Sequence, residues 1–360
     1  MLELTTAGES HGPALVAIVS GLPAGLLLDR EGIDADLARR QQGYGRSPRQ
    51  QLERDRVEVL AGLRHGRTLG TPLALVVRNL DHENWAWGMS PWPPEEEPSG
   101  KGTKPVTLPR PGHADLAGAQ KFGLEDVRDA LERASARQTA VAVAAGAVAK
   151  ALLAVLNVQV RGQALDEAGA DPAAVDAARK DRDTLGGVVE VRAQGVPPGL
   201  GSYATKDERL DARLAAALMG IQAVKGVEVG DGFALARARG SAAHDEIVRD
   251  ERGLHRPSNR AGGIEGGVSN GEEIVVRAAM KPLPTLMKPL SSVDLHSGEP
   301  AEALVERSDV SAVEALAVVA EAAVAFELAR AAREKFGGDS LGDFIAAHNA
   351  YVERLDWQPR

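Results

Sequence analysis

The chain has 360 residues, of which 44% are hydrophobic, and a formal net charge of -9. This negative charge argues against non-specific nucleic-acid binding, which requires a basic surface. The chain has no cysteine, which excludes disulfides, thiolate catalysis and cysteine-ligated metal and is compatible with a reducing cytoplasm. The first residues lack the pattern of a signal peptide, and the longest apolar run, 140–149, is far shorter than the roughly 20 residues of a membrane span. We therefore expect a soluble cytoplasmic protein without membrane, nucleic-acid or metal partners.

The predicted elements indicate an α+β fold in a single domain over residues 1–360. Strand-like segments lie at 15–19, 57–60, 73–77, 187–193 and 273–279, and short helices at 33–40, 124–132, 172–181 and 208–219. Two longer helices, 135–156 and 311–336, are apolar around most of their circumference, so we place them in the middle of the molecule. Because strands and helices do not alternate regularly, antiparallel sheets around a helical centre fit better than a doubly wound parallel sheet.

Two of the eight histidines lie in glycine-flanked turns. His11 lies in GESHG at 8–12, and His113 lies in RPGHAD at 110–115. Histidine exchanges protons near neutral pH, so both are candidates for acid–base chemistry. The alternative interpretation is that each side chain only bonds a nearby carbonyl group in its turn.

Arginines gather in a few short segments of this acidic chain. Guanidinium groups bind phosphate and carboxylate groups through two parallel hydrogen bonds, so such clusters favour a ligand with several negative charges. The alternative for the first cluster is a solvated helix end that pairs with Asp34 and Asp36. The segment 39–49 holds Arg39, Arg40, Arg46 and Arg49, and Arg110, Arg133 and Arg137 lie near His113 or the start of the first long helix.

The segment 84–105, NWAWGMSPWPPEEEPSGKGTKP, is rich in proline, glycine and charge and holds three tryptophans. Long loops in compact domains are usually lids, binding loops or disordered segments. We expect a surface loop that acts as a lid, with plain disorder as the alternative.

Three segments suit contacts with a cofactor. The glycine-rich stretch 259–271 would let backbone amides approach a planar or anionic ligand, although such a loop is more often a plain turn. The segment 281–285, KPLPT, is a stiff loop with one cation and one hydroxyl group. Arg133, Ala134 and Ser135 open the first long helix, whose N-terminus favours anions.

The start of the second long helix offers two interpretations for Asp309. This residue could cap the helix or stabilise its positive end. Ser311, followed three positions later by Glu314, predicts a capping box that competes for the same role, and Gly337 with Gly338 predicts the end of the helix. The residues alone leave the role of Asp309 open.

Nine motifs in this order resemble the chorismate synthase family along nearly the whole chain. The resemblance implies a β–α–β sandwich, with a helical centre between antiparallel sheets, in a homotetramer. It implies an anti-1,4-elimination of phosphate from 5-enolpyruvylshikimate-3-phosphate that requires reduced FMN and causes no net redox change. The motifs are GESHG (8–12), RRQQGYGR (39–46), RPGHAD (110–115), RASARQTA (133–140), QAVKGVEVGDGF (222–233), NRAGGIEGGVSNGEE (259–273), KPLPTL (281–286), RSD (307–309) and KFGGD (335–339).

The resemblance also implies a role for each matching residue. His11 would protonate or stabilise the reduced flavin, His113 would protonate the departing phosphate, and Asp309 would help flavin N5 act as base. Ser10 and Ser135 would relay or orient protons. Substrate phosphate and carboxylates would be bound by Arg40, Arg46, Arg110 and Arg137, and in members that reduce their own flavin Arg40 and Arg46 are associated with NADPH. FMN contacts would come from Arg133, Ala134, Ser135, Gln222, Ala223, Gly266, Lys281, Pro282, Leu283, Pro284, Thr285 and Arg307.

The chain departs from the family pattern at two places. Gln138 stands where the family usually has glutamate, and the region 158–184 is shorter than is common. Neither change removes a residue that is assigned to the site. Two rival functions are an FMN oxidoreductase with net hydride transfer to a small anionic substrate, and a non-catalytic anion-binding protein.

Overall fold

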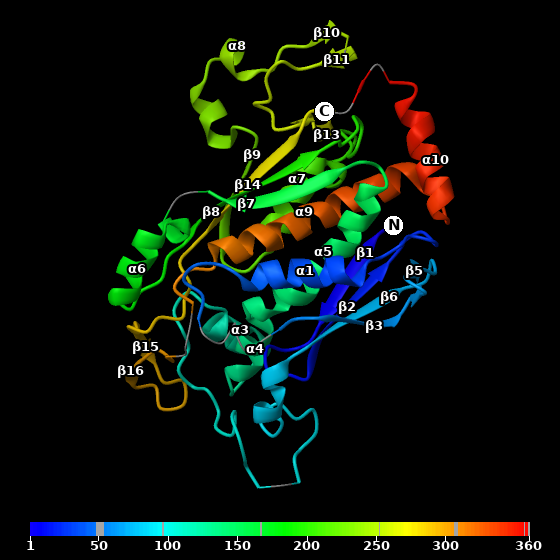
Figure 1. Ribbon diagram of the computed structural model, residues 1–360. Coiled ribbons are helices and arrows are strands. Elements are labelled where there is room, and N and C mark those ends of the chain that lie inside the picture. The colour runs from blue at the N-terminus through cyan, green and yellow to red at the C-terminus, as the bar shows by residue number, and fades with distance from the viewer. Residues whose placement is uncertain are drawn as a thin grey trace.

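Two four-stranded antiparallel sheets enclose a layer of helices in the computed structural model (Figure 1), which describes residues 1–47, 54–95, 97–165, 168–251, 253–305, 309–355 and 357–358. The first sheet has the strand order β1-β2-β6-β3 and the second β7-β8-β14-β9. Their bounds are β1 Glu3–Ala7, β2 Ala14–Ser20, β3 Val57–Ala61, β6 Leu73–Arg78, β7 Gln159–Ala164, β8 Gly187–Gln194, β9 Val224–Val229 and β14 Ile274–Met280. The predicted α+β fold is confirmed.

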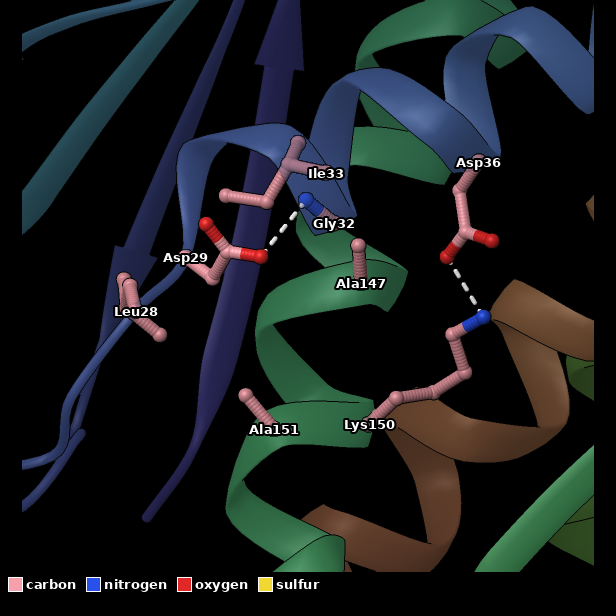
Figure 2. A pocket seen from close by; sticks show the side chains of 8 residues that line it. All are labelled: Leu28, Asp29, Gly32, Ile33, Asp36, Ala147, Lys150 and Ala151. Carbon is pink, nitrogen blue, oxygen red and sulfur yellow. Dashed lines mark hydrogen bonds and ion pairs between the residues drawn. The ribbon is translucent and has the colours of Figure 1, made fainter.

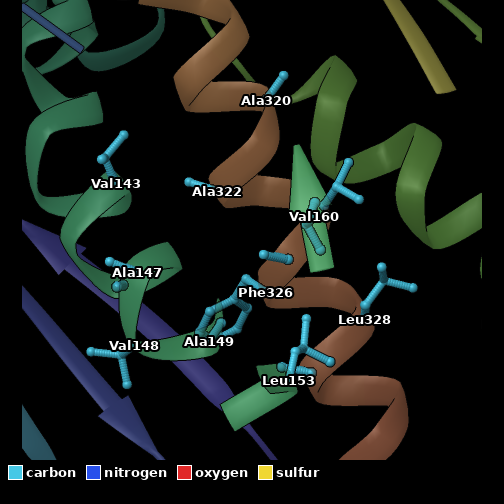
Figure 3. Close-up of a cluster of buried hydrophobic side chains, with 14 of the residues drawn as sticks. Val143, Ala147, Val148, Ala149, Leu153, Val160, Ala320, Ala322, Phe326 and Leu328 are labelled. Carbon is cyan, nitrogen blue, oxygen red and sulfur yellow. The ribbon is translucent and has the colours of Figure 1, made fainter. Parts of the chain in front are cut away.

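The two predicted core helices form the centre of the layer. α5 (Thr139–Ala154) packs against β2 and β6 of the first sheet, and α9 (Val313–Phe336) packs against β7 and β8 of the second. The two helices also pack on each other, and their alanines let them approach closely, as Figure 3 shows around Ala147, Ala322 and Phe326. A single buried cluster therefore includes residues of both sheets and both helices.

The remaining helices cover this centre or connect its strands. α1 packs on α5 and α9, and α7 packs on α9 and β9. Their bounds are α1 Arg30–Gln41, α3 Asp115–Phe122, α4 Arg128–Ala134, α6 Pro172–Lys180, α7 Leu210–Met219, α8 Gly240–Ala243 and α10 Leu341–Val352. Short 3-10 helices are η1 Leu80–Trp85, η2 Ala136–Gln138, η3 Ala168–Ala170, η4 Lys206–Glu208 and η5 Gly232–Arg237. Two-stranded pieces pair β4 Leu63–Arg64 with β5 Arg67–Thr68, β10 Val248–Asp250 with β11 Gly253–His255, β12 Ile264–Glu265 with β13 Val268–Ser269, and β15 Ser291–Val293 with β16 Pro300–Glu302.

The predicted capping box at the start of α9 is wrong. Ala312 occupies the N-cap position without a side-chain hydrogen bond. The Ser311 hydroxyl instead donates to the Gly169 carbonyl at 2.6 Å, and the Glu314 carboxylate accepts the Tyr44 N–H at 3.1 Å. Both side chains are used to hold other segments against the helix start. The predicted end of the helix at Gly337 is confirmed.

One helical stretch of the described residues, Arg128–Ala154, is long and apolar enough to cross a membrane by length and composition. It comprises α4, η2 and α5, and 67% of its most apolar window is buried within the protein. α5 lies between the first sheet and α9, so the apolar character of this stretch is that of a core helix.

Candidate active site

His11 is fixed against a buried glutamate at the end of α4. Its backbone N–H lies 2.8 Å from Glu132 Oε2, and its ring Nδ1 lies 2.8 Å from Oε1 and 3.0 Å from Oε2 of the same carboxylate. The Ser10 N–H donates to the Glu132 carbonyl oxygen at 3.1 Å, and Ser135 Oγ lies 3.3 Å from Ser10 Oγ. The structure thus brings Ser10, His11 and Ser135 together, as the resemblance implied.

The turn that carries His11 depends on Gly8. Its φ of +109° is unfavourable for other residues, and a Cβ atom there would lie 2.4 Å from the Ala14 carbonyl oxygen. This close approach lets the chain leave β1, present Ser10 and His11 to α4, and return as β2. The Gly8 carbonyl also accepts hydrogen bonds from Arg133 and Gln138, which ties the turn to the start of the core helices.

The start of the 84–105 segment covers His11. The Trp85 indole is stacked on the imidazole, and His82 Nδ1 lies 2.9 Å from the His11 carbonyl oxygen. Lys101 closes the segment by pairing with Asp81 at 3.0 Å, and its backbone N–H donates to the Asn84 carbonyl at 2.8 Å. The predicted long loop therefore begins as the 3-10 helix η1 and is anchored on the site; lid motion stays a prediction.

Arg40 and Arg137 share one carboxylate beneath this turn. Asp55 Oδ2 lies 3.4 Å from Arg40 and Asp55 Oδ1 lies 2.7 Å from Arg137. Arg40 also donates to Thr139 Oγ1 at 2.7 Å. Burial lowers the pKa of the Arg40 guanidinium to about 10; the Asp55 charge opposes this shift, and Arg137 and Arg46 add to it. The Asp55 carboxylate therefore holds these two guanidinium groups close to each other.

Arg46 and Asp309 form a further ion pair in this region, 3.3 Å apart. The Ser47 N–H donates to the same carboxylate at 2.6 Å, so Asp309 holds the segment after α1 rather than capping α9. Burial lowers the pKa of the Arg46 guanidinium, and its Nε atom is buried without a hydrogen-bond partner. Arg39 does not join this group, because it pairs with Asp36 and Glu321 in the helical layer. The pair with Asp36 is one that the alternative interpretation of the arginine cluster predicted.

His113 belongs to a second network at the start of α3. Its Nδ1 contacts Asp115 Oδ1, and Arg110 donates to Asp115 Oδ2 at 2.9 Å through Nε and to Thr285 Oγ1 at 3.0 Å. Burial alone would raise the pKa of the Asp115 carboxyl group, but the hydrogen bonds from His113 and Arg110 hold it below its ordinary value. The Lys281 ammonium group donates to the Gly112 carbonyl in the same turn.

The helix pair α3–α4 relates the two histidine networks. A short loop joins these helices, and a Cβ atom at Gly118 would lie 2.8 Å from that of Ala130, so they run antiparallel in contact (Figure 1). Asp115 lies three residues before Gly118, and Arg133 lies three residues after Ala130. The start of α3, with the His113 network, and the end of α4, with the His11 network, therefore lie at the same end of the pair.

The residues expected to contact FMN fall into three groups. Arg133 and Gln222 line one cavity of about 740 Å³, which β1, α7 and α9 also border. The Lys281 N–H donates to the Ala223 carbonyl oxygen at 3.0 Å, which places the 281–285 segment beside 222–223. Gly266 lies in the turn between β12 and β13, which precede β14, whereas Lys281 follows the end of β14, so a strand length of about 20 Å lies between the two ends of β14. Arg307 lies outside the described residues.

The donor set around Arg133 fits an anionic cofactor. Its guanidinium group bonds the carbonyl oxygen and hydroxyl of Thr6 at 3.0 Å each, the Gly8 carbonyl at 3.2 Å and the amide oxygen of Gln138. All of these acceptors are neutral, so the positive charge at the cavity wall is not compensated by them. A phosphate group at this wall would supply the compensating charge.

A smaller cavity of about 250 Å³ lies between α1 and α5, away from the predicted site residues (Figure 2). Lys150 points across it and pairs with Asp36 at 2.5 Å. The Lys150 and Asp36 side chains that line this cavity thus link α5 to α1.

Three functional candidates, Glu132, Asp55 and Asp115, were not predicted as site residues. Glu132 and Asp55 each contact a predicted site residue far away in the sequence, since 121 positions separate Glu132 from His11 and 82 separate Asp55 from Arg137. Asp115 lies in the RPGHAD motif, two positions after His113. The one local signal for Glu132 was its position directly before the predicted anion-binding residues 133–135.

Comparisons with known proteins of three kinds give the same family. A sequence model of the family described as chorismate synthase matches residues 2–332. Chorismate synthase of Desulforudis audaxviator is 54% identical over 387 aligned positions, covering 99% of this chain and 98% of the relative, and that of Rubrobacter xylanophilus is 54% identical, covering 98% and 96%. A solved structure titled "Crystal Structure of Chorismate Synthase" superposes with a TM-score of 0.77 at 36% identity, covering 98% of this chain and 97% of the other. The chain therefore belongs to the chorismate synthase family.

Proposed function

We propose that the His11 and His113 networks form one active site, in which this chain eliminates phosphate from 5-enolpyruvylshikimate-3-phosphate with the help of reduced FMN to give chorismate. Family membership makes the chain a carbon–oxygen lyase of the shikimate pathway that uses a reduced flavin. The choice of FMN, the residues of the site and their roles are our proposal. One observation carries it: two histidines, each against a buried carboxylate, lie at the same end of one helix pair, and two arginines of the motifs meet on the Asp55 carboxylate.

The arginines and histidines of the proposed site have separate roles in substrate binding and proton exchange. Arg40, Arg46, Arg110 and Arg137 bind the phosphate and carboxylate groups of the substrate. His113, fixed by Asp115 beside Arg110, donates a proton to the departing phosphate, and His11 exchanges a proton with the cofactor. When bound, reduced flavin would supply the electron density for loss of phosphate from C3 and take it back on loss of the C6 proton. Asp309 would assist the removal of that proton. Ser10 and Ser135, in contact with each other, orient protons beside His11.

Cofactor binding is assigned to the walls of the larger cavity. The positions Arg133, Ala134 and Ser135 hold the cofactor phosphate or ring from one side, and Gln222, Ala223 and the segment 281–285 from another. Because Gly266 lies about one strand length away in the same chain, its contact requires another copy of the chain or a different role. A homotetramer, which the resemblance implies, would provide other copies; light scattering of the purified protein tests that state.

NADPH is the proposed reductant of the flavin, with Arg40 and Arg46 near its phosphates. The buried Nε of Arg46, which has no hydrogen-bond partner, is the supporting observation. Anaerobic oxidation of NADPH by the protein with FMN alone tests this point, because a protein that relies on a separate reductase leaves NADPH unchanged.

The experiment that tests the proposed function is an anaerobic assay with photoreduced FMN and 5-enolpyruvylshikimate-3-phosphate. Phosphate and chorismate should appear together in equal amounts, while the reduced flavin is recovered after many turnovers. An FMN oxidoreductase would instead consume one reductant per turnover. A non-catalytic anion-binding protein would form no product, and it would behave the same after His11→Ala or His113→Ala, whereas we expect either change to lower the rate by roughly 10²–10⁴-fold.

A further inference from the structure

Each candidate histidine meets a buried carboxylate through the same ring atom. His11 Nδ1 lies 2.8 Å from Glu132, which is 1% exposed, and His113 Nδ1 contacts Asp115, which is 0% exposed. The two pairs come from different segments, one joining the β1–β2 turn to α4 and the other within the turn that starts α3. The shared feature is therefore the orientation of the ring: in both cases Nε2 is the nitrogen that is turned away from the carboxylate.

A carboxylate accepts hydrogen bonds and cannot donate them, so the nitrogen that faces it must carry the proton. Asp115 is a carboxylate under ordinary conditions, because its pKa lies below the usual range despite its burial. Arg110 approaches His113 Nδ1 at 3.2 Å but also donates to Asp115, so the carboxylate remains the acceptor that both groups share. For His11, Glu132 accepts the backbone N–H as well as the ring, which fixes both ends of the residue.

We propose that Glu132 and Asp115 are positioning residues that hold His11 and His113 in the Nδ1–H tautomer, so that Nε2 of each ring is the atom that exchanges a proton with cofactor or substrate. This inference rests on the proposed function, since it assigns the reacting atom of the two proposed proton-exchanging groups. It adds that the two carboxylates act through the histidines and need not touch a ligand.

Replacement of each acid by its amide gives a sharp test, because size is kept while one acceptor becomes a donor. In Glu132→Gln, the amide oxygen can still accept the His11 backbone N–H from the Oε2 position, 3.0 Å from Nδ1, which leaves the amide nitrogen at the Oε1 position, the nearer one to Nδ1 at 2.8 Å. In Asp115→Asn, the oxygen stays with the Arg110 backbone N–H and Nε, 3.0 and 2.9 Å from Oδ2, which again places the amide nitrogen at Nδ1 of His113. Both variants should therefore force the Nε2–H tautomer. An amide replacement of this kind in serine proteases lowers kcat by about 10⁴-fold.

The experiment uses full-length protein labelled with ¹⁵N-histidine, whose long-range ¹H–¹⁵N NMR spectra distinguish the two tautomers. His11→Gln and His113→Gln assign the two signals among the eight histidines. We expect Nδ1–H signals for both residues in the unaltered protein, a switch to Nε2–H for one residue in each amide variant, and a fall in kcat of roughly 10²–10⁴-fold with KM changed far less. Glu190→Gln removes a buried acid on β8 that pairs with Arg192 and Arg277, and it should alter neither readout.

The outcomes separate this inference from the proposed function. A neutral ring with its proton on Nε2 and none on Nδ1, for either histidine in the unaltered protein, overturns the inference, and this measurement does not depend on the folding of any variant. An amide variant that loses activity while the tautomer stays Nδ1–H also overturns it. If the tautomers switch as expected but turnover is unchanged, the positioning by the carboxylates stands, whereas the catalytic role proposed for the histidines fails.

Discussion

The Trp85 indole lies almost flat on the His11 imidazole, with ring centroids 4.1 Å apart and planes inclined by 23°. The indole is 9% exposed and also has Lys101 and Arg128 over its ring, at 5.7 and 5.0 Å from the centroid. Its Nε1–H donates to Asp81 at 3.0 Å. The stack therefore joins the start of the 84–105 segment to the most constrained histidine of the site.

We expect Trp85→Ala to lower the free energy of unfolding by about 3–5 kcal/mol, because it removes a large buried ring and leaves a cavity. Turnover should fall as well, since one face of His11 loses its support. Urea unfolding and steady-state kinetics measure the two effects. Trp92→Ala is the matched control, because Trp92 is 78% exposed and should be neutral. Equal stability of the two variants would show that the stack contributes little.

Arg46→Ala should raise the substrate KM roughly 10- to 100-fold while the fold is kept, because charge-assisted hydrogen bonds to the substrate are lost. Kinetics and calorimetric binding of 5-enolpyruvylshikimate-3-phosphate check this expectation. Arg30→Ala serves as the control, since Arg30, at the start of α1, has a side chain that is 67% exposed. Unaltered substrate binding in Arg46→Ala would contradict the assignment.

Gly146→Ala should destabilise the protein although alanine is the better helix former. A Cβ atom at Gly146 would lie 2.3 Å from the Cβ of Ala322, so α5 and α9 would have to move apart. We expect the free energy of unfolding to fall by about 1–3 kcal/mol, because the cost of overpacking exceeds the gain in helix propensity. Gly342→Ala in α10 is the control, because its nearest neighbour, Ser340 Oγ, would be 3.6 Å away and the change should stabilise slightly. Thermal unfolding of both variants decides; a more stable Gly146→Ala would contradict the close packing.

The lowered pKa of Glu321 makes the free energy of unfolding depend on pH. Burial alone would raise the pKa of its carboxyl group, but hydrogen bonds from Arg39 and Lys150, the charge of Lys150 and the Gly162 N–H lower it to about 2. Because this folded-state pKa is below the ordinary value of 4.5, the stabilisation is complete above about pH 4.5 and is lost as the pH falls towards 2.

Glu321→Gln should therefore cost about 3–5 kcal/mol at pH 7, because it breaks a buried charge network. The difference from the unaltered protein should stay constant from pH 7 to 5 and shrink below about pH 4.5. Urea unfolding along this pH series measures it, with the exposed residue variant Glu353→Gln as control. A difference that stays constant down to pH 3.5 would contradict the low pKa of Glu321.

The sequence predicted the centre of the fold better than its edges, for physical reasons. α5 and α9 are apolar on all sides and long, so composition alone locates them. β1, with the residues ELTTA, was missed because it is an edge strand with a half-polar pattern, and α3 and α10 were missed because they are short or amphipathic.

Site residues were predictable where a motif carries them and unpredictable where only the fold pairs them. His11, Ser10 and Ser135 lie in two motifs that meet in the structure. Glu132 could not be assigned to His11 from one sequence, because many acids were equally available and only the packing of α4 against the β1–β2 turn selects it. Ser311 shows the reverse case: its local pattern predicts a capping box with Glu314, whereas its hydroxyl donates to the Gly169 carbonyl and accepts the Val313 N–H at 3.3 Å.

The contact of Gly118 with Ala130 has a consequence for how this enzyme tolerates change. Glu132 and Asp115, the acids that contact the two candidate histidines, belong to this one helix pair, so the distance between the two rings depends on how closely the helices approach. A larger side chain at position 118 would push the two helices apart and with them the two rings that we propose to exchange protons.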